Sequence, residues 1–178
     1  MTREIIIAGF GGQGVMSMGK MLVEAGMAEG YNVSWVPSYG PEMRGGTANC
    51  AVVISDEPVG SPLVVQPNEL IAMNGPSLKK FEPHVEAGGL ILVNSSQAPE
   101  RVHRQDVRAF YVPSMEEAGK LGNFKVANMV MLGAYIAATG ALKMGTLEQM
   151  LSHIFTGNKA PLVTLNVQAL QAGAAYIK

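Results

Sequence analysis

The pattern best able to support chemistry is a glycine-rich turn near the start of the chain. It follows a β-branched apolar run at residues 5–8, predicted as a buried strand. It precedes residues 15–28, where apolar side chains recur at helical spacing. Such a unit leaves backbone N–H groups at the helix start free to face an anion, and it lets a ligand or partner come close. The G-x-G-x-x-G spacing starts at Gly9, and the candidate contact residues are Gly11, Gly12, Gln13 and Gly14.

Two interpretations of this turn stay open: a ligand contact, or a tight connection needed only to pack the helix on the strand. A dinucleotide site of the usual kind also needs an Asp or Glu at the end of the second strand, roughly 20 residues further on. The predicted second strand, residues 32–36, is followed by Pro37, Ser38 and Tyr39 and carries no carboxylate, while Glu29 lies before it. We therefore predict that the turn does not form a standard NAD site.

A second stretch, residues 37–47, is rich in turn-forming residues, with two prolines, three glycines, one Glu and one Arg. This composition predicts a stiff, exposed, irregular loop. If the first two strands are parallel neighbours, this loop and the glycine turn lie at the same sheet edge, where open α/β sheets bind ligands. The candidate contact residues of the loop are Tyr39, Gly40, Glu42, Arg44, Gly45 and Gly46.

Three of these side chains carry specific chemistry. The guanidinium of Arg44 can bind a phosphate or a carboxylate through two hydrogen bonds. Glu42 can pair with Arg44 and fix the loop, or accept hydrogen bonds from a partner; the alternative is a surface loop with an internal ion pair. Tyr39 is a candidate acid–base phenol, with stacking or packing as its alternative role.

Length and composition limit the class of protein. A chain of 178 residues fits one domain, residues 1–178, with a real hydrophobic core. It is 48% hydrophobic and only 15% charged, so we expect a partner or a homodimer to cover part of its surface. A net charge of −1 without a basic run argues against nucleic acid as a partner.

No membrane or export segment is predicted. The first residues enter a strand directly and show no signal peptide. The most apolar window, residues 126–142, is interrupted by Asn128, Gly133 and Gly140, and it is shorter than the roughly 20 residues that span a bilayer. We expect a core helix in a cytoplasmic protein.

The side chains of a self-sufficient metal or redox centre are missing. The single cysteine, Cys50, excludes an intrachain disulfide, an iron–sulfur cluster held by this chain alone and a cysteine-based zinc site. We predict that it is a small buried hydrophobe. The histidines at 84, 103 and 153 show no metal-ligand spacing. We predict no metal site and no catalytic residue in this chain.

The remaining pattern predicts an α/β fold with a Rossmann-like start, a mixed but mostly parallel sheet and a helical last third. Further strands are expected at residues 48–55, 70–73, 90–93 and 107–112, and a hairpin at 56–62 would make the sheet mixed. Asn94 ends one of these strands, as a ligand contact or as part of a turn. The predicted helix signals are capping boxes at Ser114 and Thr146, a terminal Gly140 and an initial Pro161.

Taken in order, these motifs resemble the gamma subunit of the 2-oxoacid:ferredoxin oxidoreductases. The matching segments are residues 9–15, 38–46, 52–56 and 70–74. The pairing of the glycine turn with a Tyr-Gly-Pro-Glu-x-Arg-Gly-Gly loop is specific. The Arg-Gly-Gly and the Gly-Ser-Pro at 60–62 are most similar to the 2-oxoglutarate or branched-chain 2-oxoacid enzymes, with the pyruvate enzymes second.

The resemblance implies a subunit that is not catalytic alone. Complexes of that family decarboxylate a 2-oxoacid on thiamine diphosphate and Mg, pass electrons through iron–sulfur clusters to ferredoxin, and transfer the acyl group to coenzyme A. The cofactors are expected in alpha, beta and ferredoxin-like delta subunits, and none in this chain. The chain is expected to dock on those subunits and to help close the coenzyme A side through Gly11 to Gly14, Tyr39, Glu42, Arg44 and Gly45.

Two alternatives remain. A free-standing nucleotide- or flavin-binding protein would use the turn at Gly9 to Gly14, although the missing carboxylate counts against it. An indolepyruvate oxidoreductase-type subunit shares the glycine turn. A neighbouring gene with thiamine diphosphate motifs, together with a small ferredoxin-like chain, would favour the first reading of the resemblance.

Overall fold

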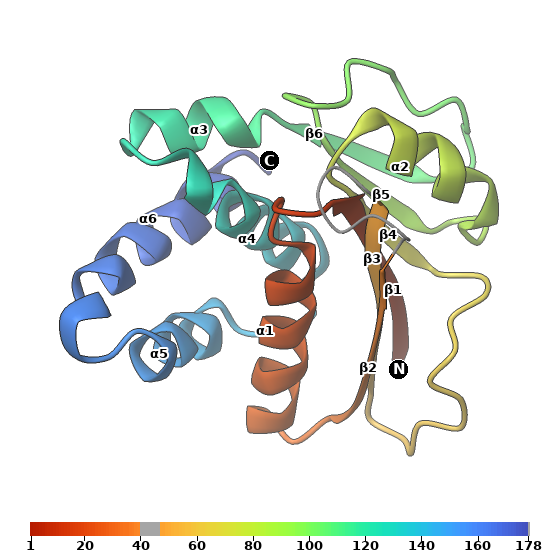
Figure 1. Ribbon diagram of the computed structural model, residues 1–178. Coiled ribbons are helices and arrows are strands. Elements are labelled where there is room, and N and C mark those ends of the chain that lie inside the picture. Colours follow the sequence, from red (N-terminus) through yellow and green to blue (C-terminus); the bar gives the residue numbers. More distant parts are fainter. Residues whose placement is uncertain (40–46, 178) are drawn as a thin grey trace.

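Helices cover both faces of a six-stranded sheet in the computed structural model, which describes residues 1–39 and 47–177 (Figure 1). The strand order is β2-β3-β1-β4-β5-β6. β1, β4, β5 and β6 are parallel, whereas β3 runs antiparallel to both of its neighbours. The predicted α/β class, the mixed sheet and the helical last third are confirmed.

Along the chain, α1 follows β1 and α2 follows β4, whereas β2, β3 and β4 come one after another, as do β5 and β6; the elements after β6 are helical. The strands are β1 (Thr2–Phe10), β2 (Asn32–Tyr39), β3 (Thr47–Ser55), β4 (Glu69–Ala72), β5 (Leu90–Asn94) and β6 (Arg108–Val112). The helices are α1 (Val15–Ala28), α2 (Gly75–Phe81), α3 (Ser114–Lys120), α4 (Ala127–Thr139), α5 (Met144–Ile154) and α6 (Pro161–Ala175), with 3₁₀ turns η1 (Glu82–His84), η2 (Phe124–Val126) and η3 (Gly157–Lys159). Among the helices of the described residues, none combines the length and the apolar character that crossing a bilayer requires.

The sheet is mixed because β3 runs antiparallel to β2 and β1. The prediction of a hairpin at residues 56–62 is wrong. β2 pairs with β3 from Asn32 opposite Ser55 to Tyr39 opposite Ala48. The prediction that the strand ends at residue 36 and the loop begins at 37 is therefore wrong, because residues 37–39 pair with β3. The glycines and prolines of 56–62 belong to a loop that leads to β4, which joins the other side of β1 (Figure 1). β2 and β3 therefore lie on one side of β1 in the sheet, and β4, β5 and β6 lie on the other. The glycine turn directly follows β1, the strand at which the direction of strand addition changes.

Alternation along β1 distributes the hydrophobic core over both faces of the sheet. Ile5 and Ile7 belong to the larger core, which α1, α4, α5 and α6 share. Ile6 and Ala8 belong to the other core, with Leu78 of α2. Since successive side chains of a strand point to opposite faces, a strand covered on both sides must be apolar throughout. This explains the unbroken apolar run at residues 5–8.

Helix ends follow the prolines and glycines rather than the capping boxes. Gly140, with φ 61°, ends α4, and Pro161 begins α6, both as predicted. The capping boxes predicted at Ser114 and Thr146 are wrong, because α3 and α5 begin without a side-chain cap among the described residues. Ser114 is fully buried, and its hydroxyl donates to Asn94 Oδ1 at 2.8 Å instead.

The helices α4 and α6 touch backbone to backbone at two glycines. A Cβ added to Gly133 would lie 1.9 Å from the carbonyl oxygen of Leu170. A Cβ added to Gly173 would lie 1.8 Å from the carbonyl oxygen of Val130. Neither position has room for a methyl group, so this pair of glycines sets how closely α6 packs on the buried α4.

A buried charge cluster ties the sheet to the end of α4. The Arg3 guanidinium pairs with the Glu69 carboxylate, which also accepts a hydrogen bond from Tyr135 Oη. Arg3 Nη2 donates to the carbonyl oxygen of Thr139 at 3.1 Å. Burial raises the pKa of the Tyr135 hydroxyl well above its usual value, and the neighbouring carboxylate adds to the rise.

Replacing Tyr135 with Phe should reduce the decline of the free energy of unfolding with rising pH above about 10. Because the folded-state pKa is raised, the folded protein keeps a proton that the unfolded chain releases as the pH rises through about 10. The contribution is present below that pH and declines above it, by about 1.4 kcal/mol of unfolding free energy per pH unit. Urea denaturation at two pH values, below and above the ordinary tyrosine pKa, measures the slope. An equal decline in the variant and the parent would contradict the assignment.

Candidate functional site

The glycine turn has a backbone shape that favours glycine. Gly12 and Gly14 have φ values of 91° and 77°, in the left-handed region. A Cβ on Gly14 would also lie 2.4 Å from Asn128 Nδ2, and a Cβ on Gly9 would lie 2.6 Å from Gln13 Oε1. The turn therefore holds one specified shape between its neighbours.

Gln13 folds back over the turn and ties it to the end of β4. Its Oε1 accepts hydrogen bonds from the backbone N–H of Phe10 at 2.7 Å and from Asn74 Nδ2 at 2.9 Å. Its Nε2 donates to the carbonyl oxygen of Met73 at 3.2 Å. Asn94 Nδ2, at the end of β5, donates to the same carbonyl at 3.1 Å. Both ends of the Gln13 amide are thus used inside the chain, where they fix the turn.

The first turn of α1 opens into a hollow of about 340 Å³, which we call the glycine-turn hollow. Among the described residues no side chain caps this helix, and its first turn carries no acidic residue. The residues whose N–H groups lack an intrahelical partner, at the positive end of the helix dipole, therefore line the hollow. This arrangement suits an anion such as a phosphate group. The hollow is lined by Phe10, Gly11, Gly12, Gly14, Val15, Met16, Ser17, Tyr39 and Ala48.

The two predicted contact stretches meet at this hollow, in the part that the structure describes. Tyr39, the last residue of β2, is 56% exposed and lines the hollow together with the glycine turn. The premise that β1 and β2 are parallel neighbours is wrong, because β3 lies between them. Both run antiparallel to β3, so their carboxyl ends share one edge. Outside the described residues lie Gly40, Glu42, Arg44, Gly45 and Gly46.

A second hollow, of about 230 Å³, opens on the other side of Gly12. Gln97, Lys125 and Asn128 are among the residues of its wall. Asn94 also lines it but is only 1% exposed, and its Oδ1 accepts hydrogen bonds inside the chain. The turn-forming interpretation of Asn94 therefore fits its contacts.

Asn128 is the site residue that sequence reasoning missed. It stands on α4, 114 positions from Gly14 along the chain, and its Nδ2 donates to the Gly14 carbonyl oxygen at 3.5 Å. The only sequence signal was an amide interrupting the apolar window 126–142. A polar side chain at such a position indicates a partner across the core, although the sequence does not say which one.

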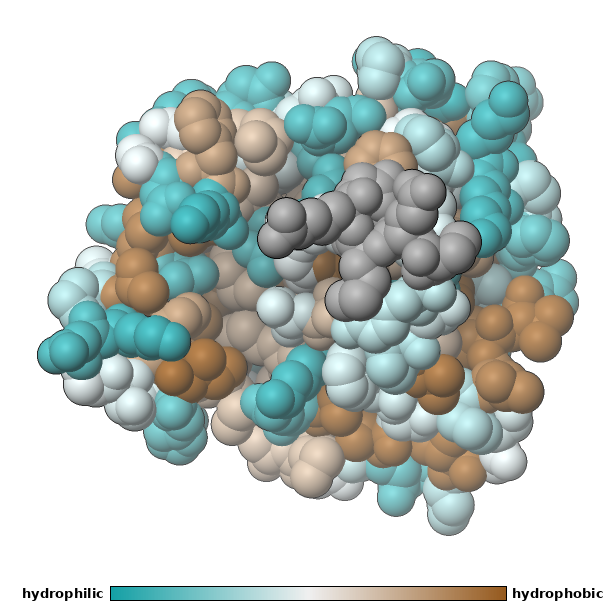
Figure 2. Space-filling model, viewed as in Figure 1, coloured by the Kyte–Doolittle hydropathy of each residue, from teal (hydrophilic) through white to brown (hydrophobic). Residues whose placement is uncertain are grey.

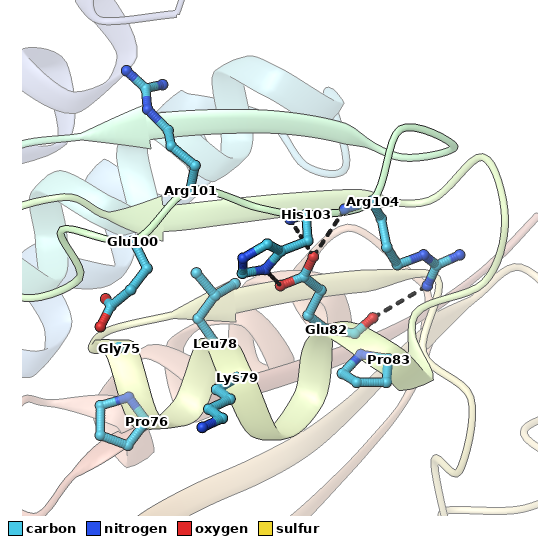
Figure 3. Close-up of a pocket in the computed structure, with 10 residues that line it drawn as sticks. All are labelled: Gly75, Pro76, Leu78, Lys79, Glu82, Pro83, Glu100, Arg101, His103 and Arg104. Carbon is cyan, nitrogen blue, oxygen red and sulfur yellow. Dashed lines mark hydrogen bonds and ion pairs between the residues drawn. The ribbon is translucent and has the colours of Figure 1, made fainter.

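A larger cavity, of about 980 Å³, lies between α2 and residues 100–104 (Figure 3). The carboxylate of Glu82, which is buried, holds this segment by accepting hydrogen bonds from the backbone N–H groups of His103 at 2.6 Å and Arg104 at 3.0 Å. Figure 3 shows the imidazole of His103 turned toward that carboxylate, with Nδ1 3.7 Å from Oε2. Within the described chain, the polar groups of this cavity hold residues 100–104 in place through hydrogen bonds of their own. We therefore place the candidate site at the glycine turn.

The side chains described do not fit a metal or iron–sulfur centre. In residues 1–39 and 47–177, no three His, Cys, Asp or Glu residues are placed to hold a metal ion. Cys50 is wholly buried as predicted, and its thiol donates to the carbonyl oxygen of Val15 at 3.7 Å. Burial raises the pKa of this thiol to about 11, so it is protonated and inert at neutral pH.

Comparison with known proteins decides the family. The family model described as pyruvate ferredoxin/flavodoxin oxidoreductase matches residues 4–176. The chain belongs to this family. The resemblance stated from the motifs is confirmed.

Three relatives illustrate the similarity. The ketoisovalerate oxidoreductase subunit VorA of Methanothermobacter thermautotrophicus is 46% identical over 177 residues, which cover 98% of this chain and 36% of that protein. The 2-oxoglutarate synthase subunit KorC of Methanothermobacter marburgensis is 37% identical over 186 residues, which cover 99% of this chain and 97% of that protein. The crystal structure of a keto/oxoacid ferredoxin oxidoreductase gamma subunit from Geobacter sulfurreducens PCA has a TM-score of 0.81 at 29% identity, with 98% and 97% covered.

The relatives differ in length. This pyruvate ferredoxin/flavodoxin oxidoreductase family member spans about a third of the VorA proteins that it matches and nearly all of KorC and of the Geobacter gamma subunit. The fold described above is thus found both as a separate chain and as a part of longer chains.

Proposed function

We propose that this chain is the gamma subunit of a thiamine diphosphate-dependent 2-oxoacid:ferredoxin oxidoreductase, and that the glycine-turn hollow belongs to its coenzyme A-facing edge. The observation that carries the proposal is the uncapped start of α1, which opens beside Gly12 and Gly14 into a hollow shared with Tyr39. Coenzyme A carries phosphate groups, which are the anions that such a helix start accepts. The relatives' names, which include 2-oxoglutarate synthase and ketoisovalerate oxidoreductase subunits, support the reaction class.

The other parts of the reaction are assigned to partner subunits. A cluster needs several cysteine ligands, and this chain has one cysteine, which is buried. Alpha, beta and ferredoxin-like delta subunits would hold thiamine diphosphate, Mg and the clusters, with ferredoxin as the electron acceptor. The residues of this chain would bind and orient a phosphate group at the start of α1, and the Tyr39 ring would shield one side of it from water.

Replacing Arg44 with Ala should impair the assembled enzyme while leaving the fold intact. The sequence predicts an exposed loop around Arg44, so the free energy of unfolding should change by no more than about 0.5 kcal/mol. The guanidinium is a candidate phosphate or carboxylate ligand, so its loss should lower turnover. The assay combines the chain with the alpha and beta subunits of the proposed complex and follows coenzyme A-dependent ferredoxin reduction with a 2-oxoacid.

The same assay tests the proposal itself. The wild-type chain alone should oxidise no 2-oxoacid, and the catalytic subunits should need it for full activity. Full activity without this chain would overturn the proposed function. Unchanged turnover with the Arg44 variant would overturn only the role of the loop.

A further inference from the structure

Exposed apolar side chains gather around the amino-terminal half of α1. Among the large apolar residues exposed in the described chain, four line the hollows there, whereas single exposed apolar residues need no special explanation. Figure 2 shows hydrophobic residues at the left of the molecule, where Figure 1 places α5 and α6. The four residues are Tyr39, Phe124, Ile154 and Leu162.

A groove of about 610 Å³, which we call the helix groove, runs between α1, α4, α5 and α6. Its wall includes buried Met21, Met129 and Leu151, so its floor belongs to the larger core. Its rim includes Ile154, 47% exposed, and Leu162, 36% exposed. An apolar floor with an apolar rim provides a surface that water covers poorly.

The helix groove is continuous with the glycine-turn hollow. Ser17, on the first turn of α1, lines both of them. Lys125 and Asn128 line both the groove and the second hollow, which in turn shares Gly12 with the glycine-turn hollow. A polypeptide that reaches the glycine turn from the side of α5 and α6 must therefore pass over the groove.

We propose that the helix groove is the docking surface for the catalytic partner polypeptide, which seats an apolar segment there. This inference rests on the proposed function and extends it, since it places the subunit contact on α1, α5 and α6. The charged residues of the groove are Lys20, Glu24 and Lys125, which leave one net positive charge. The fitting segment therefore carries apolar side chains with a carboxylate beside them.

Two observations favour this occupant over a second copy of the chain. The matching part of VorA makes up 36% of a longer protein, so in a relative this part of the sequence is covalently joined to further polypeptide. A second copy on the groove would also cover the continuous hollow at the glycine turn, where the coenzyme must meet the catalytic subunits. A catalytic partner covers the groove and completes the hollow at once.

The test is co-expression of the chain with the alpha and beta subunits of the proposed complex, followed by measurement of the affinity between the purified subunits. Ile154→Asp should weaken assembly at least tenfold, because docking would bury an unpaired carboxylate. Leu162→Asp, at the other exposed apolar side chain of the groove rim, should act in the same direction. The matched control is Val65→Asp, at a side chain 82% exposed on the loop between β3 and β4, which should assemble like the wild type. Circular dichroism and thermal melts check that each variant folds.

Each outcome decides one claim. Weak assembly of both groove variants with normal assembly of the control supports the docking surface. Normal assembly of all three variants would overturn it and leave the proposed function standing, whereas failure of the wild type to assemble would overturn the proposed function. A groove variant that splits a homodimer yet still joins the catalytic subunits would assign the groove to a second copy and overturn the proposal.

Discussion

Replacing Gly133 with Ala should lower the free energy of unfolding by about 3 kcal/mol. The new methyl group would lie 1.9 Å from the carbonyl oxygen of Leu170, so α4 and α6 would have to separate by about 1 Å. That loss is large against the roughly 5–15 kcal/mol that stabilises an ordinary domain. Chemical denaturation measures it, and Gly173→Ala, on the facing helix, should have a similar effect.

Gly145 offers the matched control for this prediction. It stands near the start of α5, and a Cβ there would meet nothing within 4 Å. Gly145→Ala should therefore leave the stability unchanged or raise it by at most about 1 kcal/mol, because glycine is the more flexible residue in the unfolded chain. If Gly133→Ala were as harmless as this control, the close crossing of α4 and α6 would be refuted.

Replacing Ser17 with Asp should stabilise the fold and, at the same time, weaken the binding of coenzyme A to the assembled enzyme. Ser17 is exposed at the third position of α1, where a carboxylate interacts favourably with the helix dipole, so the fold should gain about 0.3–1 kcal/mol. The same carboxylate would occupy the wall of the glycine-turn hollow and repel a phosphate group. The KM for coenzyme A of the assembled enzyme should rise about tenfold or more, which corresponds to about 1.4 kcal/mol.

Ser17→Asn is the control, because it has the size of Asp without the charge. Its KM for coenzyme A should stay close to the wild-type value. A second check is salt, since added salt screens an exposed charge and should reduce the penalty in the Asp variant. A KM that Asp leaves unchanged would show that the anion binds elsewhere.

Local sequence signals predicted most of the elements, because their causes are local. The apolar run at residues 5–8, the glycines after it and the helical spacing of 15–28 specify a strand, a turn and a helix without help from the rest of the chain. Gly140 and Pro161 mark helix ends because each restricts its own backbone. The fold class followed from these elements in sequence.

The strand pairing and the caps of two helices could not be predicted, because contacts distant in the sequence decide them. Residues 56–62 have the composition of a tight turn, yet the next strand, β4, joins β1 and not β3. Ser114 has the sequence context of a cap, yet burial against β5 directs its hydroxyl to Asn94. A side chain that bonds its own backbone in one context bonds a neighbour in another.

The candidate site was predicted in part for the same reason. The glycine turn and Tyr39 each carry a local signature, and the shared edge of the sheet brings them together. Asn128 and the helix groove have no such signature, since they arise only when α4, α5 and α6 pack beside α1. Sequence reasoning found the residues that shape the backbone and missed those that the tertiary fold supplies.

The buried thiol of Cys50 beneath α1 can be used to measure how often α1 separates from the sheet. The Cys50 sulfur lies where a Cβ on Gly19 would come within 2.5 Å of it, so a labelling reagent can react only when the helix lifts away from the sheet. The rate of alkylation then follows how often that opening occurs. Because the sequence has no other cysteine, the alkylation rate also measures how much a bound coenzyme or an attached subunit suppresses the opening of α1.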